Sequence, residues 1–172
     1  MRDSPYDRSV AIETLAAFIR LKSPASTEGS TGYIENKKSP VPESARAAFH
    51  AIARRAVNPN DPQIDLSRCN LRLIYCDNAN LAGVSFARSN LQQSSFTHAN
   101  LRGAYFMGAE LGFVWFSESE LTESKFPEAH VGNCMFVESV LDKANFAVAH
   151  DMTPDTLTVM KSHVGAIFPW TD

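Results

Sequence analysis

Residues 64–148 of this 172-residue chain form an uninterrupted run of five-residue blocks, and no other feature limits the fold as strongly. With the positions of a block numbered i−2, i−1, i, i+1 and i+2, seventeen blocks follow one another without an insertion. Fifteen of them carry Leu or Phe at position i, and fifteen carry Ala, Ser, Cys or Val at i−2. The other three positions are mostly polar residues or Gly.

A period of five fits neither an α-helix, which repeats every 3.6 residues, nor a plain strand, which repeats every two. It fits a short extended piece followed by a turn. Residues i−2 and i then share the inner face, i−1 points outward, and i+1 and i+2 turn the corner. The chain is therefore expected to wind into a coil whose interior is buried only when neighbouring coils stack.

Blocks such as residues 79–83 (ANLAG) and 99–103 (ANLRG) resemble the A(D/N)LxG consensus of pentapeptide-repeat proteins. The resemblance covers about half of the chain. It implies a mainly β fold, a right-handed quadrilateral β-helix (a pentapeptide-repeat solenoid) with four blocks per coil and about four coils. At roughly 4.8 Å per coil, the rod is expected to be about 20 Å tall.

A coil of twenty residues sorts the inward side chains into columns, with Phe facing Phe and Leu facing Leu across the rod. A random run of apolar residues would not sort in this way. The expected Phe columns are Phe86, Phe106, Phe126 and Phe146 on one face, and Phe96, Phe116 and Phe136 on the opposite face.

Two amphipathic helices are expected in the N-terminal segment, residues 1–56. The first is predicted over residues 4–21 with Ser4 as its N-cap, and the second over residues 43–55. Residues 23–42 between them are rich in Ser, Pro and Gly and predict a flexible linker. Because short helices are marginal alone, both are expected to cover the first open edge of the β-helix. Their apolar stripes are Ala11, Leu15, Phe18 and Ile19, and Ala45, Ala48, Phe49, Ile52 and Ala53.

The N-terminal part also resembles the cytoplasmic part of actinobacterial pentapeptide-repeat proteins, through residues 2–5, 15–20, 53–55 and 64–67. In many of those proteins membrane helices precede this segment. This chain has no apolar run approaching the eighteen or so residues of a membrane span, so no membrane segment and a cytoplasmic location are expected. The resemblance implies no settled activity, and it leaves open whether the chain is a soluble relative or part of a longer protein.

The repeat register ends at Asp151, which sets the β-helix at residues 64–150 and a C-terminal capping helix and tail at residues 151–172. Thr153 is the expected N-cap of that helix, with Leu157, Met160 and Val164 on one side. The apolar tail that follows is expected to fold back on the cap or the rod. A homodimer through the C-terminal cap is the alternative.

Outward positions decide function, because the interior is occupied by packing. Tyr75, Ser95, Trp115 and Met135 take position i−1 on one face, one coil apart, and Val137 lies beside them; we call this the apolar strip. Outward Trp and Met on a polar rod predict a binding surface, unless the N-terminal helices, the linker or the tail lie across it. The candidate partner- or ligand-binding residues are Tyr75, Tyr105, Met107, Phe113, Trp115, Met135 and Val137, of which Tyr105 and Met107 belong to another face.

A polar column of Glu110, His130 and His150 offers a second candidate. A carboxylate and imidazoles about 5 Å apart could bind a metal or move protons. A solvated column beneath Asn70 and Asn90 is the favoured interpretation, so no metal, cofactor or catalytic residue is predicted. The inward Cys69, Cys76 and Cys134 are expected to be small apolar fillers, which suits a reducing compartment.

The charge distribution offers a third candidate. Residues 1–56 carry a net charge of +3 and residues 57–172 a net charge of −6. Some pentapeptide-repeat proteins resemble DNA in size, shape and charge and bind type II topoisomerases such as gyrase. The low basic charge argues against direct nucleic-acid binding. The acidic face would comprise Glu110, Glu118, Glu120, Glu123 and Glu138, with Glu128 nearby.

The leading hypothesis is a non-enzymatic interaction module that presents one face of the rod to a protein partner. One alternative is a DNA mimic that binds a type II topoisomerase through its glutamates. The other is a small-molecule binding protein or unusual enzyme with a pocket between the N-terminal segment and the rod. The sequence leaves the partner, the ligand and the oligomeric state open.

Overall fold

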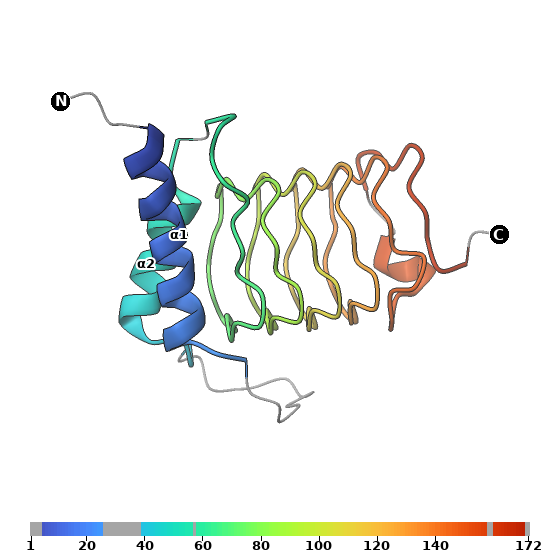
Figure 1. The fold of residues 1–172 in the computed structure, drawn as a ribbon. Helices are drawn as coiled ribbons and strands as arrows, with labels where there is room; N and C mark the ends of the chain where they lie inside the picture. The colour runs from blue at the N-terminus through green and yellow to red at the C-terminus, as the bar shows by residue number, and fades with distance from the viewer. Residues whose placement is uncertain (1–4, 26–38, 57, 158–159, 171–172) are drawn as a thin grey trace.

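The structure, a computed structural model, describes residues 5–25, 39–56, 58–157 and 160–170. Two α-helices stand at one end of a right-handed β-helix of stacked coils, and a short 3₁₀-helix lies near the other end (Figure 1). The expected N-cap Ser4 and most of the expected linker lie outside the described residues. The helices are α1 (Pro5–Lys22), α2 (Glu43–Ala53) and η1 (Pro154–Leu157).

Parallel backbone bridges between residues 20 positions apart join the coils. Each column of the rod is built from single bridged residues, and no longer strand occurs among the residues that the structure describes. The β structure is therefore a ladder of isolated bridges, which is less strand than a mainly β fold suggests. Four columns give each coil four five-residue sides, and they begin at Asp65, Asn70, Tyr75 and Asn80.

The corners between sides have one backbone conformation. Every i+2 residue from Arg68 to Lys143 has a positive φ, between 54° and 69°. The carbonyl at position i accepts a hydrogen bond from the N–H three residues later, as when Val114 donates to Leu111 at 3.1 Å. A positive φ at the second turn position is the geometry of a type II turn. The corner thus turns the chain onto the next side of the coil within two residues and returns the next i−2 side chain to the interior.

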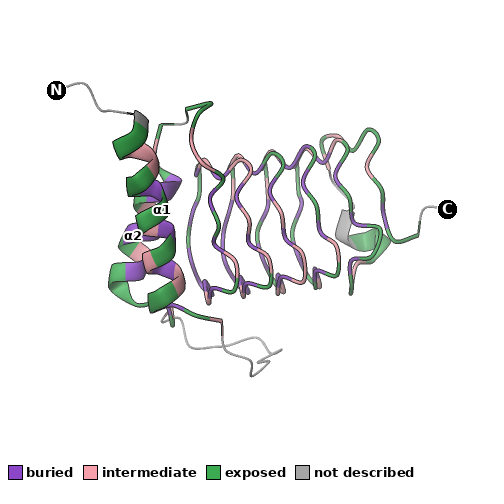
Figure 2. Ribbon diagram, viewed as in Figure 1, coloured by how far each residue is buried: buried purple, intermediate pink, exposed green. Residues whose placement is uncertain are grey.

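Buried residues recur on every coil of the rod (Figure 2), and among them are two stacked Phe columns, as the sequence predicts. Rings one coil apart are nearly parallel, with centroids 5.4 Å apart for Phe86 and Phe106 and 5.2 Å apart for Phe116 and Phe136. The two columns meet edge to face across the core, as do Phe106 and Phe116 at 6.0 Å. Both offset stacking and edge-to-face contact are favourable for aromatic quadrupoles.

Replacing Phe116 by Ala is expected to lower the free energy of unfolding by about 3–5 kcal/mol, because the side chain is fully buried between Phe96 and Phe136. Urea unfolding would measure the change. Trp115→Ala, at the neighbouring outward position, is the matched control and should cost far less. Equal losses for the two variants would contradict the assignment of inward and outward positions.

Helices α1 and α2 pack on each other over the first coil. The predicted stripe of α2 is confirmed, with Phe49 and Ile52 fully buried. The predicted stripe of α1 is rotated: Ile12, Ala16 and Ile19 are buried, and Ala11 is exposed. The difference arises because apolar residues lie on most sides of α1 between Val10 and Leu21, so the sequence pattern does not single out the face that makes the contact.

Backbone groups of the N-terminal segment cover the first open edge of the β-helix. The Asn70 N–H donates to the Ser23 carbonyl at 2.7 Å, and the Ala25 N–H donates to the Arg68 carbonyl at 2.7 Å. On another side, the Asn80 N–H donates to the Ala53 carbonyl at the end of α2, at 2.8 Å. An edge that would otherwise invite strand addition is thereby satisfied within the chain.

A buried carboxylate ties α1 to the end of α2. Asp61 accepts from Arg8 Nε at 2.6 Å and lies 3.4 Å from Arg55 Nε. Arg55 in turn donates from Nη1 to the Asn80 carbonyl at 3.0 Å, which reaches the first coil. The hydrogen bonds from Arg8, above all, lower the pKa of Asp61 to about 2.

This carboxylate should make stability depend on pH at the acid end. Because its folded pKa lies below the unfolded value, its contribution is fully present above about pH 4 and is lost as pH falls through about 2. Asp61→Asn should therefore cost about 2 kcal/mol at pH 7, and its difference from the native chain should shrink between pH 4 and 2. Thermal unfolding at several pH values would measure this, with Glu128→Gln as the exposed control. A pH-independent difference would contradict the role of the carboxylate.

The C-terminal end differs from the expectation of a capping helix. Only Pro154–Leu157 is helical, as a 3₁₀-helix, and the exposed Val164 lies in a turn. The ladder then resumes: Val140 pairs with Ser162 and Asn145 with Ile167, 22 rather than 20 positions apart. The β-helix therefore extends beyond residue 150 after an excursion that adds two residues to the coil.

The tail lies against the rod in the described residues. Phe168 is buried and stacks on Phe146 with ring centroids 5.8 Å apart, which lengthens one Phe column. Trp170 stacks on Phe168 at 5.5 Å and is partly exposed. The end of the interior is thus covered by two further aromatic rings.

Candidate functional site

None of the described segments lies over the apolar strip. Tyr75, Trp115 and Met135 follow one another in a single bridge column with Ser95 among them. Their exposed fractions are 54%, 38% and 50%. Ser95 is buried and makes a hydrogen bond with Asp77, so it contributes no surface. We call the side of the rod that carries this column the Trp115 face.

Two further candidates border this column, and two lie elsewhere. Val137 and Phe113 are exposed beside it, the latter at the corner with the side that carries Glu110. Tyr105 belongs to the bridge column of the opposite side, and its hydroxyl contacts Met107 Sδ at 3.2 Å. The predicted apolar residues thus form two separate surfaces, and only the one around Trp115 is extensive.

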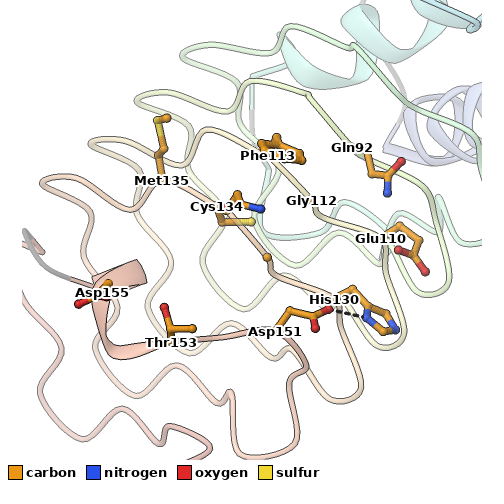
Figure 3. A pocket seen from close by; sticks show the side chains of 12 residues that line it. Gln92, Glu110, Gly112, Phe113, His130, Cys134, Met135, Asp151, Thr153 and Asp155 are labelled. Carbon is orange, nitrogen blue, oxygen red and sulfur yellow. Dashed lines mark hydrogen bonds and ion pairs between the residues drawn. The ribbon is translucent and has the colours of Figure 1, made fainter. Parts of the chain in front are cut away.

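A cleft of about 710 Å³ lies at the corner between the Trp115 face and the Glu110 column (Figure 3). Phe113 and Met135 lie on one side, and Glu110, His130 and Asp151 on the other. The structure therefore brings together two features that are separate in the sequence, the apolar strip and the polar column. We call this cleft the corner groove.

Two glycines form the floor of the corner groove. Gly112 and Gly132 take the same i+1 position one coil apart, beneath Gln92. Neither has a positive φ, so the backbone does not require glycine at either position. A Cβ at Gly112 would meet only ordinary contacts, the nearest at 3.7 Å to Gln92 Nε2. The hollow exists because side chains are absent here and not because the turn demands it.

The polar wall is built around His130. Its Nδ1 lies 3.0 Å from Asp151 Oδ2, and its ring stacks on His150 at 4.8 Å between centroids. The carboxylate of Glu110, next in the column, makes no hydrogen bond or ion pair with any described residue. Sequence reasoning missed Asp151 because it falls where the register ends. Within the described residues no three side chains converge as metal ligands would.

Polar atoms without partners lie at the head of the corner groove. Gln92 lines the groove, is 6% exposed, and has no hydrogen-bond partner for Oε1 among the described residues. Arg72 lies one coil before Gln92 in the same i+1 column, outside the groove lining, is equally buried, and has no partner for Nε or Nη2 in the described part of the chain. Burial lowers the pKa of Arg72. Repeat position alone would not have revealed either side chain, since i+1 is normally a solvated corner.

Most of the predicted acidic residues border one side of the rod. Glu118 and Glu138 share one corner column with His98, whose Nδ1 lies 3.4 Å from Glu118. Together with Glu120 they line one hollow. Glu123, at the other corner of that side, lies 3.8 Å from Lys143 Nζ. Glu110 lies on the opposite side, so the predicted acidic set falls on two sides of the rod.

Inward polar groups are engaged in packing. Ser89 and Ser94 donate to backbone carbonyls of the preceding coil at 2.7 and 2.9 Å. Cys69, Cys76 and Cys134 are free and buried, and burial raises the pKa of each thiol, to about 12 for Cys69 and Cys134. Neutral thiols in such surroundings are poor nucleophiles.

Comparison with known proteins identifies the repeat. A family model described as pentapeptide repeats matches residues 63–97 and 74–112, with eight copies. No curated protein matches this chain. Among the described residues, neither α1 nor any other helix has the length and apolar character needed to cross a bilayer.

Solved structures with the same kind of repeat are similar to part of this chain. One is a pentapeptide repeat protein from the thylakoid lumen of Arabidopsis thaliana, 26% identical over 56% of this chain and 59% of that chain, with a TM-score of 0.31. Another is QnrB1, a plasmid-mediated fluoroquinolone resistance protein, 18% identical over 62% of this chain and 56% of that chain, with a TM-score of 0.29. The matched regions span less than two thirds of either protein.

Two glycine substitutions should separate the structural glycines from those of the corner groove. Gly103→Ala is expected to cost about 1 kcal/mol, because φ is +62° and the added Cβ meets nothing within 4 Å. Gly112→Ala should be neutral or stabilise by up to about 1 kcal/mol, because the backbone is ordinary and the unfolded chain loses freedom. Denaturant unfolding of both variants measures this. A large loss at Gly112 would mean that the glycine serves the fold.

Proposed function

We propose that this protein, whose repeat region matches the pentapeptide-repeat family, is a non-enzymatic interaction module that binds a protein partner through the Trp115 face. The observation that carries the proposal is the exposure of Trp115 at 38% and Met135 at 50%, on successive coils of a rod whose interior is complete without them. Buried clusters of Trp and Met at the centre of an interface commonly supply most of its binding energy.

The surroundings of the apolar strip support a docking role. Phe113, Trp115, Met135 and Val137 are neighbours on one surface, and each is more than a third exposed. Helices α1 and α2 bury their apolar residues against each other and the first coil, away from the strip (Figure 1). Large exposed apolar side chains that no described segment covers are typical of a surface with a partner.

A cytoplasmic location remains part of the proposal, and buried free thiols suit a reducing compartment. Self-association through the C-terminal end is a second possibility, supported by the exposure of Val164, Ile167 and Trp170. The topoisomerase alternative depends on the glutamates, of which Glu118 and Glu138 are stacked in one corner column.

Site-specific photocrosslinking would test the docking face. A benzophenone side chain placed at Trp115 should capture a protein partner in the cells that make this protein. The same group at Lys125, in the i−1 column of the opposite side, is the matched control and should capture none. Trp115→Ala should weaken the affinity for the captured partner by about 2 kcal/mol, as expected for an aromatic anchor.

The outcomes separate the candidate functions. Equal crosslinking from both positions would rule out a dedicated Trp115 face. Loss of partner binding with the double charge reversal Glu118→Lys and Glu138→Lys, and not with Trp115→Ala, would favour the topoisomerase alternative. Crosslinking to a second copy of the chain would assign the face to self-association.

A further inference from the structure

We propose that the corner groove binds an arginine or lysine side chain on an extended segment of the partner protein. The inference rests on the proposed docking role of the Trp115 face and specifies the chemistry of its occupant. The groove adjoins that face, because Phe113 and Met135 line the groove and flank Trp115. A segment lying along the apolar strip could therefore place one side chain into the groove.

The volume of the corner groove is large enough to hold a bound side chain. A volume of about 710 Å³ is within the range of sites that bind small molecules or side chains. The depth comes from Gly112 and Gly132, where the same column carries Gln92 one coil before Gly112 and Arg72 two coils before it. Neither glycine has a positive φ, so the turn conformation does not explain the missing side chain at Gly112, whereas a Cβ at Gly132 would lie 3.3 Å from Asp151 Cβ.

The charge of the groove selects a cation. Its lining includes the carboxylates of Glu110, Asp151 and Asp155, and no Lys or Arg. Asp151 is engaged with His130 at 3.0 Å, whereas the carboxylate of Glu110 has no hydrogen bond or ion pair with a described residue. A guanidinium or ammonium group beside Glu110 would form a charge-assisted hydrogen bond, the stronger class of such bonds.

The opposite wall accepts the aliphatic part of such a side chain. Phe113 and Met135 face the polar wall across the groove (Figure 3). Arg and Lys bury their methylene stems along apolar surface while the charged head remains with polar groups. An apolar wall opposite a carboxylate wall matches this division within one side chain.

Gln92 provides an independent indication of a ligand. It is 94% buried, its Oε1 has no hydrogen-bond partner among the described residues, and its Nε2 is the atom nearest Gly112 at the head of the groove. A buried amide with an unmatched atom is costly unless a hydrogen bond is supplied from elsewhere. A half-turn of the amide would present Oε1 to a peptide or guanidinium N–H over Gly112 and supply that bond.

The same column orients the ligand. Arg72 lies on the N-terminal side of Gln92, so positive charge is concentrated above the groove and negative charge beside and below it. The cationic head is therefore directed toward Glu110 and Asp151 and away from Arg72. An anionic ligand would meet the carboxylates, which excludes a phosphate or carboxylate occupant.

Titration of the full, ¹⁵N-labelled chain would test the inference by NMR. The probe is acetyl-Leu-Arg-Leu-amide, whose leucines can reach the apolar strip. We expect shifts centred on the amides of Gly112, Gly132 and Met135. The neutral citrulline analogue should bind about tenfold more weakly, because it keeps the shape and loses the charge. Agmatine, a free cation without a peptide backbone, should also bind more weakly than the arginine peptide.

Matched variants locate the interaction. Glu110→Gln should weaken peptide binding about fivefold, and Glu120→Gln, at the same repeat position on the opposite side, should leave it unchanged. Gly112→Gln should abolish binding by filling the floor with a side chain like that of Gln92. If Gly112→Gln proves unstable, Gly112→Ala, for which the added Cβ meets only ordinary contacts, takes its place with a partial loss.

Four results would overturn the inference: no shifts up to the solubility limit, equal binding of the citrulline analogue, shifts centred on another side, or insensitivity to Glu110→Gln. Agmatine binding as tightly as the peptide would reassign the groove to a small cationic molecule. A Trp115 crosslink without peptide binding would retain the docking face and remove the arginine site. Peptide binding without a Trp115 crosslink would retain the arginine site and remove the docking face.

Discussion

Contact between successive coils holds this rod together, since a single coil has neither internal backbone ladders nor a buried interior. The Phe116 ring is stable because Phe96 and Phe136 lie above and below it, and its backbone N–H bonds to the carbonyl of Met135 in the next coil. Both ends of such a stack are exposed unless something else covers them. The α1–α2 pair provides one cover, and Phe168 with Trp170 provides the other.

Interior and surface are therefore specified by different positions of the same block. Side chains at i and i−2 are fixed by the space between coils, whereas i−1, i+1 and i+2 are free to vary. The outward Trp115 and the corner residue Phe113 are not required by the stack. Phe113 adopts a φ of 62°, the same positive φ that every corner residue from Arg68 to Lys143 has, so its backbone is that of the repeat. The outward residues that could contact a partner are thus additional to a rod whose packing does not depend on them.

The five-residue period predicted the Phe columns and the inward cysteines, because position within the block dictates direction. The apolar stripe of α2 could also be predicted, since the apolar residues of that helix lie on one face. The bridges at Ser162 and Ile167 could not be predicted, because two extra residues after Asp151 break the five-residue period. The corner groove could not be predicted from the sequence. It depends on the absence of side chains at Gly112 and Gly132 and on Asp151, which lies where the register ends. A search for repeat patterns considers the side chains that are present and not those that are absent.

The covered first edge also bears on how the chain acquires its structure. Synthesis proceeds from the N-terminus, so α1, α2 and the segment around Ser23 leave the ribosome before the coil whose edge they bind. Each later coil then finds a finished edge to add to, and growth has one direction. The excursion at η1 comes last, when four columns already exist to align Ser162 and Ile167. A nascent chain of this kind is expected to add each new coil to the edge of the coil before it, starting from the end that the helices cover.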